Sequence, residues 1–406
     1  MTPARERRIL TLATLGIVGV GSYASFAIPV LAGVLQERFS LSDSGLGLVL
    51  SANMVGGVAG GLVGGVLADR LGRRRTLRSL AWLAAVGWLL CGLGGLPILM
   101  AGLAIGGFGF SGALTAGSAL LSGLYPDRRR ASYSTILVTS ALAGIVLPPA
   151  IAVLRSGVRA GDIRFELAVG GPFALVALVV ATLAWLAGTA RSSHERSRAS
   201  DATTAMRGPV VAGIALIVAL AACHSAADTT LYSWMPRFLT TTFTSHSFDP
   251  AIVLSLYSAV YLIGRLALSA MPDTVATNAL LIAPGILGGT LALLSVHAST
   301  FAGAAWLYVA ASAMYGLEFP SLMGLAARRY PDRFGTVCGL VSAANLVAAV
   351  GVWGVGKATE ITGSMRPGMS AACLGFIVFG LGCALWLRLN NRATSAVSKE
   401  CGDEGE

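Results

Sequence analysis

Charged residues are scarce in this 406-residue chain, and lysine is nearly absent from it. Asp, Glu, Lys and Arg together make up 12% of the residues, about half of the ~25% found in soluble domains, whereas 55% of the residues are hydrophobic. So few charges cannot cover the surface of a soluble protein of this length. The 51 glycines follow no collagen period and form no linker, and they suit helices packed closely in a membrane.

Motifs for catalysis, metal binding and nucleotide binding are also missing from the sequence. The four His residues are scattered, the six Cys residues contain no C-x-x-C pair, and no G-x-x-x-x-G-K-[ST] loop occurs. The basic residues form short clusters without interleaved aromatic residues, which argues against a nucleic-acid partner. We therefore expect no enzyme, no metal, no cofactor and no ATP-driven machine.

Twelve apolar runs are long enough to cross a bilayer as helices of about 20 residues. They lie at 9–35, 46–68, 77–96, 98–124, 131–154, 167–189, 209–238, 250–271, 275–296, 300–327, 334–358 and 369–389. The sequence thus predicts an all-α membrane protein with twelve transmembrane helices. With a cytoplasmic N-terminus, 21 of the 29 Lys and Arg residues fall on the cytoplasmic side, so we expect both termini there.

An internal repeat predicts two pseudo-symmetric six-helix bundles. The tetrapeptide Tyr-Pro-Asp-Arg at 125–128 recurs at 330–333, and Asp69 after the second run corresponds to Asp273 after the eighth. The expected organisation is one bundle at 1–189, a cytoplasmic linker at 190–208, a second bundle at 209–390 and a polar tail at 391–406. In duplicated transporters the solute site lies between the halves, near the middle of the membrane.

The loop after the second run carries the most specific motif of the chain. Residues 65–75 read G-V-L-A-D-R-L-G-R-R-R, which resembles the G-x-L-x-D-R-x-G-R-[RK]-[RK] signature of the major facilitator superfamily at every position. The resemblance implies a transporter whose conformations are biased by this loop, with the gating residues Gly65, Asp69, Arg70, Gly72, Arg73 and Arg74. The alternative is that the loop only anchors the topology. The arginine that many members carry in the fourth span is missing from 101–109, so its role in coupling cannot be transferred.

Three segments of the second half resemble the fucose-permease-like branch of that superfamily. They are the acid-x(5)-Trp-x-Pro segment at 228–236, the Gly-Arg-Leu segment at 264–266 and the Phe-Pro-Ser segment at 319–321. In the first of them Asp228 replaces the more usual Glu. The resemblance implies a sugar moved together with protons. Together with the polar residues described below, we expect a small polar solute that is sugar-like or a small organic acid.

Ionisable residues inside apolar runs are costly and therefore candidates for function. Glu318 lies near the middle of the tenth run, and we predict that it binds and releases the coupled proton; a buried hydrogen bond or ion pair is the alternative. His224 and Asp228 are four residues apart on one helical face, which suits either a proton relay or a solvated pair at the outer mouth.

Polar side chains in other runs are candidates for solute binding. Arg265 shares one helical face with Tyr261 and Tyr257, a combination that can hold a carboxylate or a sugar ring, although Arg265 can equally neutralise Glu318 or Asp228. Asn53 and Asn345 either bond neighbouring helices or contact solute. Lys357 and Glu360 are expected to form a pair at the outer end of the eleventh run.

The sequence as a whole predicts a secondary transporter in a bacterial inner membrane. Its expected partners are a small polar solute, protons and membrane lipids, and we expect it to act as a monomer. The alternatives are a proton-driven exporter of amphipathic compounds, which requires an apolar, aromatic cavity, and a solute sensor that binds without transport.

Overall fold

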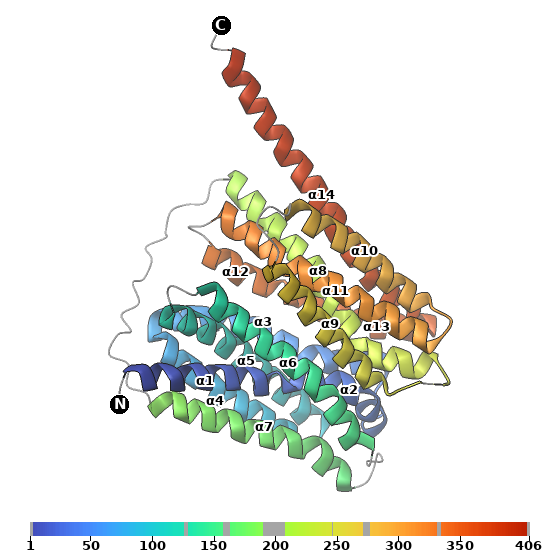
Figure 1. The fold of residues 1–406 in the computed structure, drawn as a ribbon. Helices are drawn as coiled ribbons and strands as arrows, with labels where there is room; N and C mark the ends of the chain where they lie inside the picture. Colours follow the sequence, from blue (N-terminus) through green and yellow to red (C-terminus); the bar gives the residue numbers. More distant parts are fainter. Residues whose placement is uncertain are drawn as a thin grey trace.

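The computed structural model describes residues 3–125, 129–156, 163–189, 208–245, 247–270, 277–330 and 334–403, and every regular element within them is a helix (Figure 1). The helices are α1 (Pro3–Gly21), α2 (Tyr23–Arg38), α3 (Asp43–Leu71), α4 (Arg73–Cys91), α5 (Leu96–Leu124), α6 (Arg129–Ser156), α7 (Ile163–Thr189), α8 (Gly208–Thr242), α9 (Pro250–Ala270), α10 (Thr277–His297), α11 (Phe301–Arg329), α12 (Phe334–Ala343), α13 (Asn345–Thr362) and α14 (Arg366–Asp403). The prediction of an all-α fold is confirmed.

Two pairs of helices are single rods with a local break, so the fourteen helices of the described residues form the twelve predicted rods. At the α1–α2 break, the N–H of Ser25 donates to the carbonyl of Ser22, three residues back instead of four. At the α12–α13 break, Val347 donates to Ala344 in the same way. These tighter turns lie inside the first and eleventh predicted spans.

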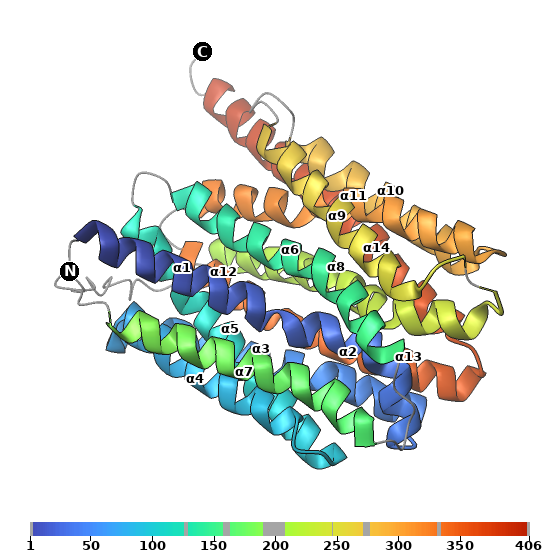
Figure 2. The ribbon, with the colours of Figure 1, turned by 60° about the horizontal axis from the view of Figure 1, so that its bottom comes forward.

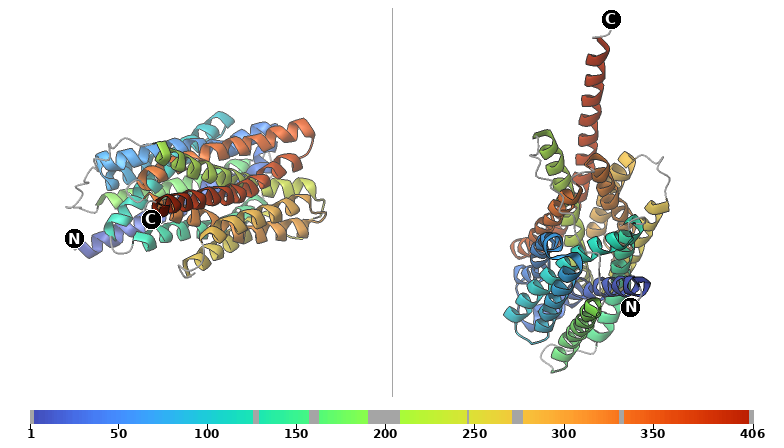
Figure 3. Two further views of the ribbon diagram at one scale, coloured as in Figure 1. Left: turned by 90° about the horizontal axis from the view of Figure 1, so that it is seen from above. Right: turned by 90° about the vertical axis from the view of Figure 1, so that its left-hand side faces the viewer.

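Nine helical stretches in the described part of the chain are long and apolar enough to cross a membrane. The remaining three rods are α4, α6 and α11, which coincide with the third, fifth and tenth predicted spans. In α6 the apolar stretch 138–154 is shorter, and the first six residues of α4 include four arginines. The predicted tail begins inside α14, which runs on to Asp403 and projects beyond the other helices (Figure 3).

Glycine allows α5 to lie very close to its neighbours. A Cβ atom added to Gly64 would lie 2.6 Å from the Cα of Gly112 on α5, and one added to Gly102 would lie 2.9 Å from the backbone nitrogen of Cys91 on α4. No side chain larger than hydrogen fits between backbones at this separation. The glycine-rich segment at 101–109 is therefore a packing surface, as the sequence predicts.

The two halves of the chain, α1–α7 and α8–α14, end their fourth and tenth spans in the same way. Tyr125 follows α5 with φ −128° and ψ 68°, and Tyr330 follows α11 with φ −131° and ψ 56°. Each donates its N–H to a carbonyl four residues back, that of Leu121 or Ala326. The repeated tyrosine thus ends a helix with one geometry in both halves; the rest of both tetrapeptides, and Asp273, lie outside the described residues.

The halves touch at the far end of the bundle, defined as the end where α3 begins and α13 ends. Ser51 on α3 donates its hydroxyl to the carbonyl of Ala349 on α13 over 2.9 Å, and a Cβ added to Gly47 would lie 3.0 Å from the Cα of Trp353. The opposite end of the bundle, where α1 and α8 begin, is called the terminal end. There the first turns of α1 and α8 lie well apart, whereas α2 and α8 lie side by side near the far end (Figures 1 and 2). The halves therefore diverge from the far end toward the terminal end.

Candidate functional site

A cavity of about 420 Å³ lies between the two halves. Helices α2, α3, α5 and α6 of the first half and α8, α9 and α13 of the second half line it. All five residues predicted to bind solute line this cavity: Asn53, Tyr257, Tyr261, Arg265 and Asn345. The two helix breaks supply wall residues as well, because Ala24 and Ser25 follow the first break and Asn345 follows the second.

Arg265 is the cationic side chain of the cavity wall. Its Nη2 donates to the hydroxyl of Tyr261 over 3.0 Å, and its guanidinium carbon lies 4.5 Å from the centre of that ring. The Nε atom is buried without a hydrogen-bond partner among the described residues, and Arg265 forms no ion pair with any of them. Neutralisation by Glu318 or Asp228, one of the two roles predicted for Arg265, is therefore not seen.

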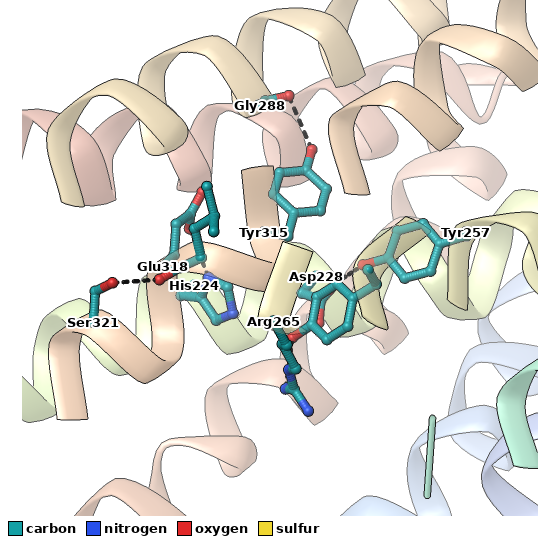
Figure 4. A network of polar contacts seen from close by, with 10 residues as sticks. His224, Asp228, Tyr257, Arg265, Gly288, Tyr315, Glu318 and Ser321 are labelled. Atoms are coloured by element: carbon teal, nitrogen blue, oxygen red, sulfur yellow. Dashed lines mark hydrogen bonds and ion pairs between the residues drawn. The ribbon is translucent and has the colours of Figure 1, made fainter. Parts of the chain in front are cut away.

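Asp228 is the acidic side chain of the same wall. It accepts a hydrogen bond from the hydroxyl of Tyr257, whose ring stacks on Tyr261 and on Tyr308. Figure 4 shows the carboxylate and Tyr257 facing each other, with the Arg265 guanidinium turned away from both. The cavity thus presents one cation and one anion that do not bind each other.

His224 and Glu318 form a pair inside the second half. The Nδ1 atom of His224 lies 2.7 Å from Oε2 of Glu318, and both side chains are almost completely buried. The predicted relay between His224 and Asp228 is not observed, and a solvated His–Asp pair is wrong, because the imidazole of α8 turns toward α11 and not along its own helix. Glu318 lies well inside α11, and its contact with His224 is the buried hydrogen bond or ion pair that the sequence analysis gave as the alternative to proton binding.

Aromatic rings surround the imidazole of His224. Its ring centre lies 5.8 Å from Phe319, 5.6 Å from Phe376 and 5.8 Å from Phe379. The second carboxyl oxygen of Glu318, Oε1, is buried without a hydrogen-bond partner in the described chain. In these apolar surroundings the polar pair is stabilised mainly by the hydrogen bond between His224 and Glu318. Gain or loss of one proton by the pair therefore changes the stability of the packing between α8 and α11.

The predicted gating loop lies between α3 and α4. Gly72 has φ 91° and ψ 140°, a backbone conformation that favours glycine. Arg73 donates to the carbonyl of Ala119 near the end of α5 over 3.0 Å. Arg74 donates from Nε and Nη2 to the carbonyls of Ala187 and Gly188 in the last turn of α7, over 2.9 and 2.7 Å.

Both arginines bind backbone near helix ends within the first half, and the carbonyls of Ala187 and Gly188 that Arg74 binds lie in the last turn of α7, where an intrahelical donor is lacking. Arg70 is exposed, and Gly65 has open space beside it except for Thr115. The side chain of Asp69 lies outside the described residues, so its part in gating stays a prediction.

Glu360 joins the two halves at the far end of the bundle. The predicted pair with Lys357 is present, with 3.1 Å between Nζ and Oε2. In addition, the N–H of Ser44 in the first turn of α3 donates to Oε1 of Glu360 over 2.9 Å. A carboxylate at a helix N-terminus is favoured by the unpaired N–H groups and by the helix dipole, so the contact bridges α3 and α13.

Apart from Asn53, sequence reasoning missed the first-half wall of the cavity, and it missed the aromatic rings around His224. Phe26 of α2 faces Tyr232 of α8 with ring centres 5.7 Å apart, and Ser25 accepts a hydrogen bond from Asn53 over 3.4 Å. The sequence does contain a signal for Tyr232, because this residue lies four positions after Asp228 on the same helix. Nothing in the sequence marks Phe26 or Phe376, because each acts through a distant helix.

Over residues 13–352 the sequence matches the family described as the Major Facilitator Superfamily. The chain belongs to this superfamily. The arabinose-proton symporter of Bacillus subtilis (strain 168) is 32% identical over 138 residues, which cover 33% of this chain and 30% of that protein. The matched stretch therefore represents less than a third of the relative's length.

Solved structures of the same superfamily share the fold. The E. coli fucose:proton symporter FucP in its outward conformation superposes with a TM-score of 0.69 at 16% identity, covering 94% of this chain and 99% of the other. The E. coli xylose transporter XylE in a partially occluded inward-open conformation gives a TM-score of 0.73 at 15% identity, covering 93% and 97%. These likenesses establish the arrangement of the helices.

Proposed function

We propose that the protein is a secondary transporter that moves a small polar solute across a membrane by alternating access, coupled to protons. The observation that carries the proposal is the cavity between the halves, in which Asp228 and Arg265 present unpaired charges beside a set of tyrosines. A cavity of this size suits a small ligand that is oriented by a few polar groups. The named sugar-proton symporters among the relatives support a sugar-like solute, and the guanidinium of Arg265 in the cavity wall suits a small organic acid.

Contacts at the far end support a conformation that is open toward the terminal end. Ser51 with Ala349 and Ser44 with Glu360 close the far end of the cavity. With both termini in the cytoplasm of a bacterial cell, as the positive-inside rule predicts, this conformation faces inward. Rocking of α1–α7 against α8–α14 then exposes the same residues to the outside.

The proposed proton carrier is the pair of Glu318 and His224. Glu318 is completely buried, so its charge is tolerated only while the imidazole is protonated opposite it. A proton that enters or leaves this pair changes the packing between α8 and α11. Because α8 also carries Asp228 and lines the cavity, protonation and solute binding act on one helix.

The test is transport by the purified protein in liposomes with an imposed pH gradient and a panel of sugars and organic acids. Glu318→Gln fixes the charge at zero and keeps the shape, so downhill exchange should persist while accumulation against a gradient falls at least tenfold. Glu37→Gln, the same change on an exposed side chain at the end of α2, is the matched control and should behave as wild type.

Other outcomes decide between the alternatives. Normal accumulation and pH response in Glu318→Gln would contradict the coupling role of Glu318. Efflux of amphipathic compounds with no movement of polar solutes would identify an exporter. Saturable binding with no flux of any compound would identify a sensor.

A further inference from the structure

We infer that the solute carries a carboxylate, and that Arg265 binds this group while Asn53 and Asp228 take hydroxyls of the same molecule. The solute is thus a small hydroxy acid of the sugar-acid class and not a neutral sugar. This inference rests on the proposed function and narrows its substrate.

The first argument is the missing counter-charge of Arg265. The guanidinium has five N–H donors, and the hydrogen bond to Tyr261 uses one of them. Its Nε is buried with no partner among the described residues, and the Tyr261 ring covers one face at 4.5 Å. An unpaired cation in partly buried surroundings is destabilising, and a carboxylate is the group that removes this penalty by two parallel hydrogen bonds.

The second argument is that the acids of this region are already engaged. Asp228 accepts from Tyr257, and Glu318 is bound to His224 behind the cavity wall. Among the described residues that line the cavity, Arg265 and Asp228 are the ones with full charges, and they form no ion pair with each other. The attraction for an anion at Arg265 is therefore not cancelled by a contact inside the site.

The third argument concerns the rest of the solute. The Oδ1 atom of Asn53 is buried without a donor in the described chain, although its amide nitrogen donates to Ser25. Asp228 offers a carboxylate that accepts hydrogen bonds. An unpaired donor on α9, an unpaired acceptor on α3 and a carboxylate on α8 that can accept more hydrogen bonds than the one from Tyr257 match a molecule that has an anionic end and hydroxyl groups.

The test measures binding to the purified wild-type protein with two matched pairs of probes. D-galacturonate and D-galactose differ by a carboxylate in place of a hydroxymethyl group, and lactate and lactamide differ by a carboxylate in place of an amide. The acid of each pair should bind at least tenfold more tightly than its neutral partner. Arg265→Gln should remove this preference, and Arg265→Lys should weaken it by about ten- to a hundredfold, because an ammonium lacks the planar fork.

Arg237→Lys, on the same helix α8 as Asp228 but outside the cavity wall, is the matched control and should leave the preference unchanged. A second measurement uses the wild-type protein alone and so does not depend on the folding of a variant. Phenylglyoxal should modify Arg265 of the wild-type protein, as detected by peptide mass spectrometry, and millimolar lactate or galacturonate should protect it whereas lactamide and galactose should not.

Equal protection by acids and neutral partners, or no modification of Arg265 at all, would overturn the inference. Proton-driven transport of neutral sugars with unchanged kinetics in Arg265→Gln would also overturn it while leaving the proposed function intact. Conversely, carboxylate protection of Arg265 without any proton-driven flux would contradict the proposed function and leave the anion site standing.

Discussion

At the scale of single residues, the most consequential contact joins the imidazole of His224 to the carboxyl of Glu318. Nδ1 of His224 and Oε2 of Glu318 are 2.7 Å apart, and the rings of Phe319 and Phe376 pack around the imidazole. Removal of one partner leaves the other group buried without its bond, which is more harmful than removal of both. The pair is thus a place where one proton can change the energy of the fold.

A double-mutant cycle can test whether the two side chains act as a unit. His224→Asn should destabilise the protein by about 3 kcal/mol, because Glu318 then remains alone in apolar surroundings. Adding Glu318→Gln to that variant should recover part of the loss, with a coupling energy of about 1 kcal/mol or more. The measurement is the thermal unfolding of all four proteins in detergent. Additive losses would show that the two side chains act independently.

At the scale of elements, the loop between α3 and α4 fixes three helices of the first half. Gly72 turns the chain, and the arginines that follow it bind the carbonyl ends of α5 and α7. The positive charges therefore lie where the helix dipoles are negative. Because these contacts stay within α1–α7, the loop stiffens one half of the molecule, which moves as a body in the cycle that we propose.

The two glycines of this loop motif should respond differently to alanine. Gly72→Ala places a Cβ at φ 91°, which costs about 1–3 kcal/mol and should lower the unfolding midpoint and slow transport. Gly65→Ala, inside α3, is the matched control. Its new Cβ would meet only Thr115 of α5, at 3.9 Å. Its stability should stay within about 1 kcal/mol of wild type. An equal loss in both variants would mean that the backbone conformation at Gly72 is not the reason.

At the scale of the whole molecule, the closed far end and the diverging terminal end match one state of the alternating-access cycle that we propose. Glu360 holds the first turn of α3 from across the interface between the halves. Because this contact joins α3 to α13, separation of the two helices at the far end would break it. The contact between Ser44 and Glu360 should therefore stabilise the conformation with a closed far end relative to one in which the cavity opens there.

Loss of this contact should shift the protein toward the other state. Glu360→Ala should raise, several-fold, the rate at which an impermeant thiol reagent applied at the far end labels an Asn345→Cys variant whose six native cysteines are replaced. Lys357→Met is the matched control: that side chain is half exposed, the ion pair contributes little, and the bond from Ser44 remains. An equal rise in both variants, or no rise in either, would contradict a closing role for Glu360.

The sequence by itself determined the number of spans and the repeat of the two halves. It also determined the signature loop at residues 65–75 and the helical face shared by Tyr257, Tyr261 and Arg265. These features depend on composition and on spacings of a few residues, which local hydrogen bonding converts directly into helices and faces. For the same reason the expected pair of Lys357 and Glu360, three residues apart, is present.

Only the tertiary structure decided which of the polar side chains meet. His224 binds Glu318, 94 residues away, and not Asp228 on its own helix; Ser44 binds Glu360, 316 residues away; and Arg265 shares a cavity wall with Asp228 without forming an ion pair with it. Each outcome depends on which helices are neighbours and on how each is rotated about its axis. Those quantities are set by packing of apolar and glycine surfaces over the whole bundle, and no short spacing in the chain encodes them.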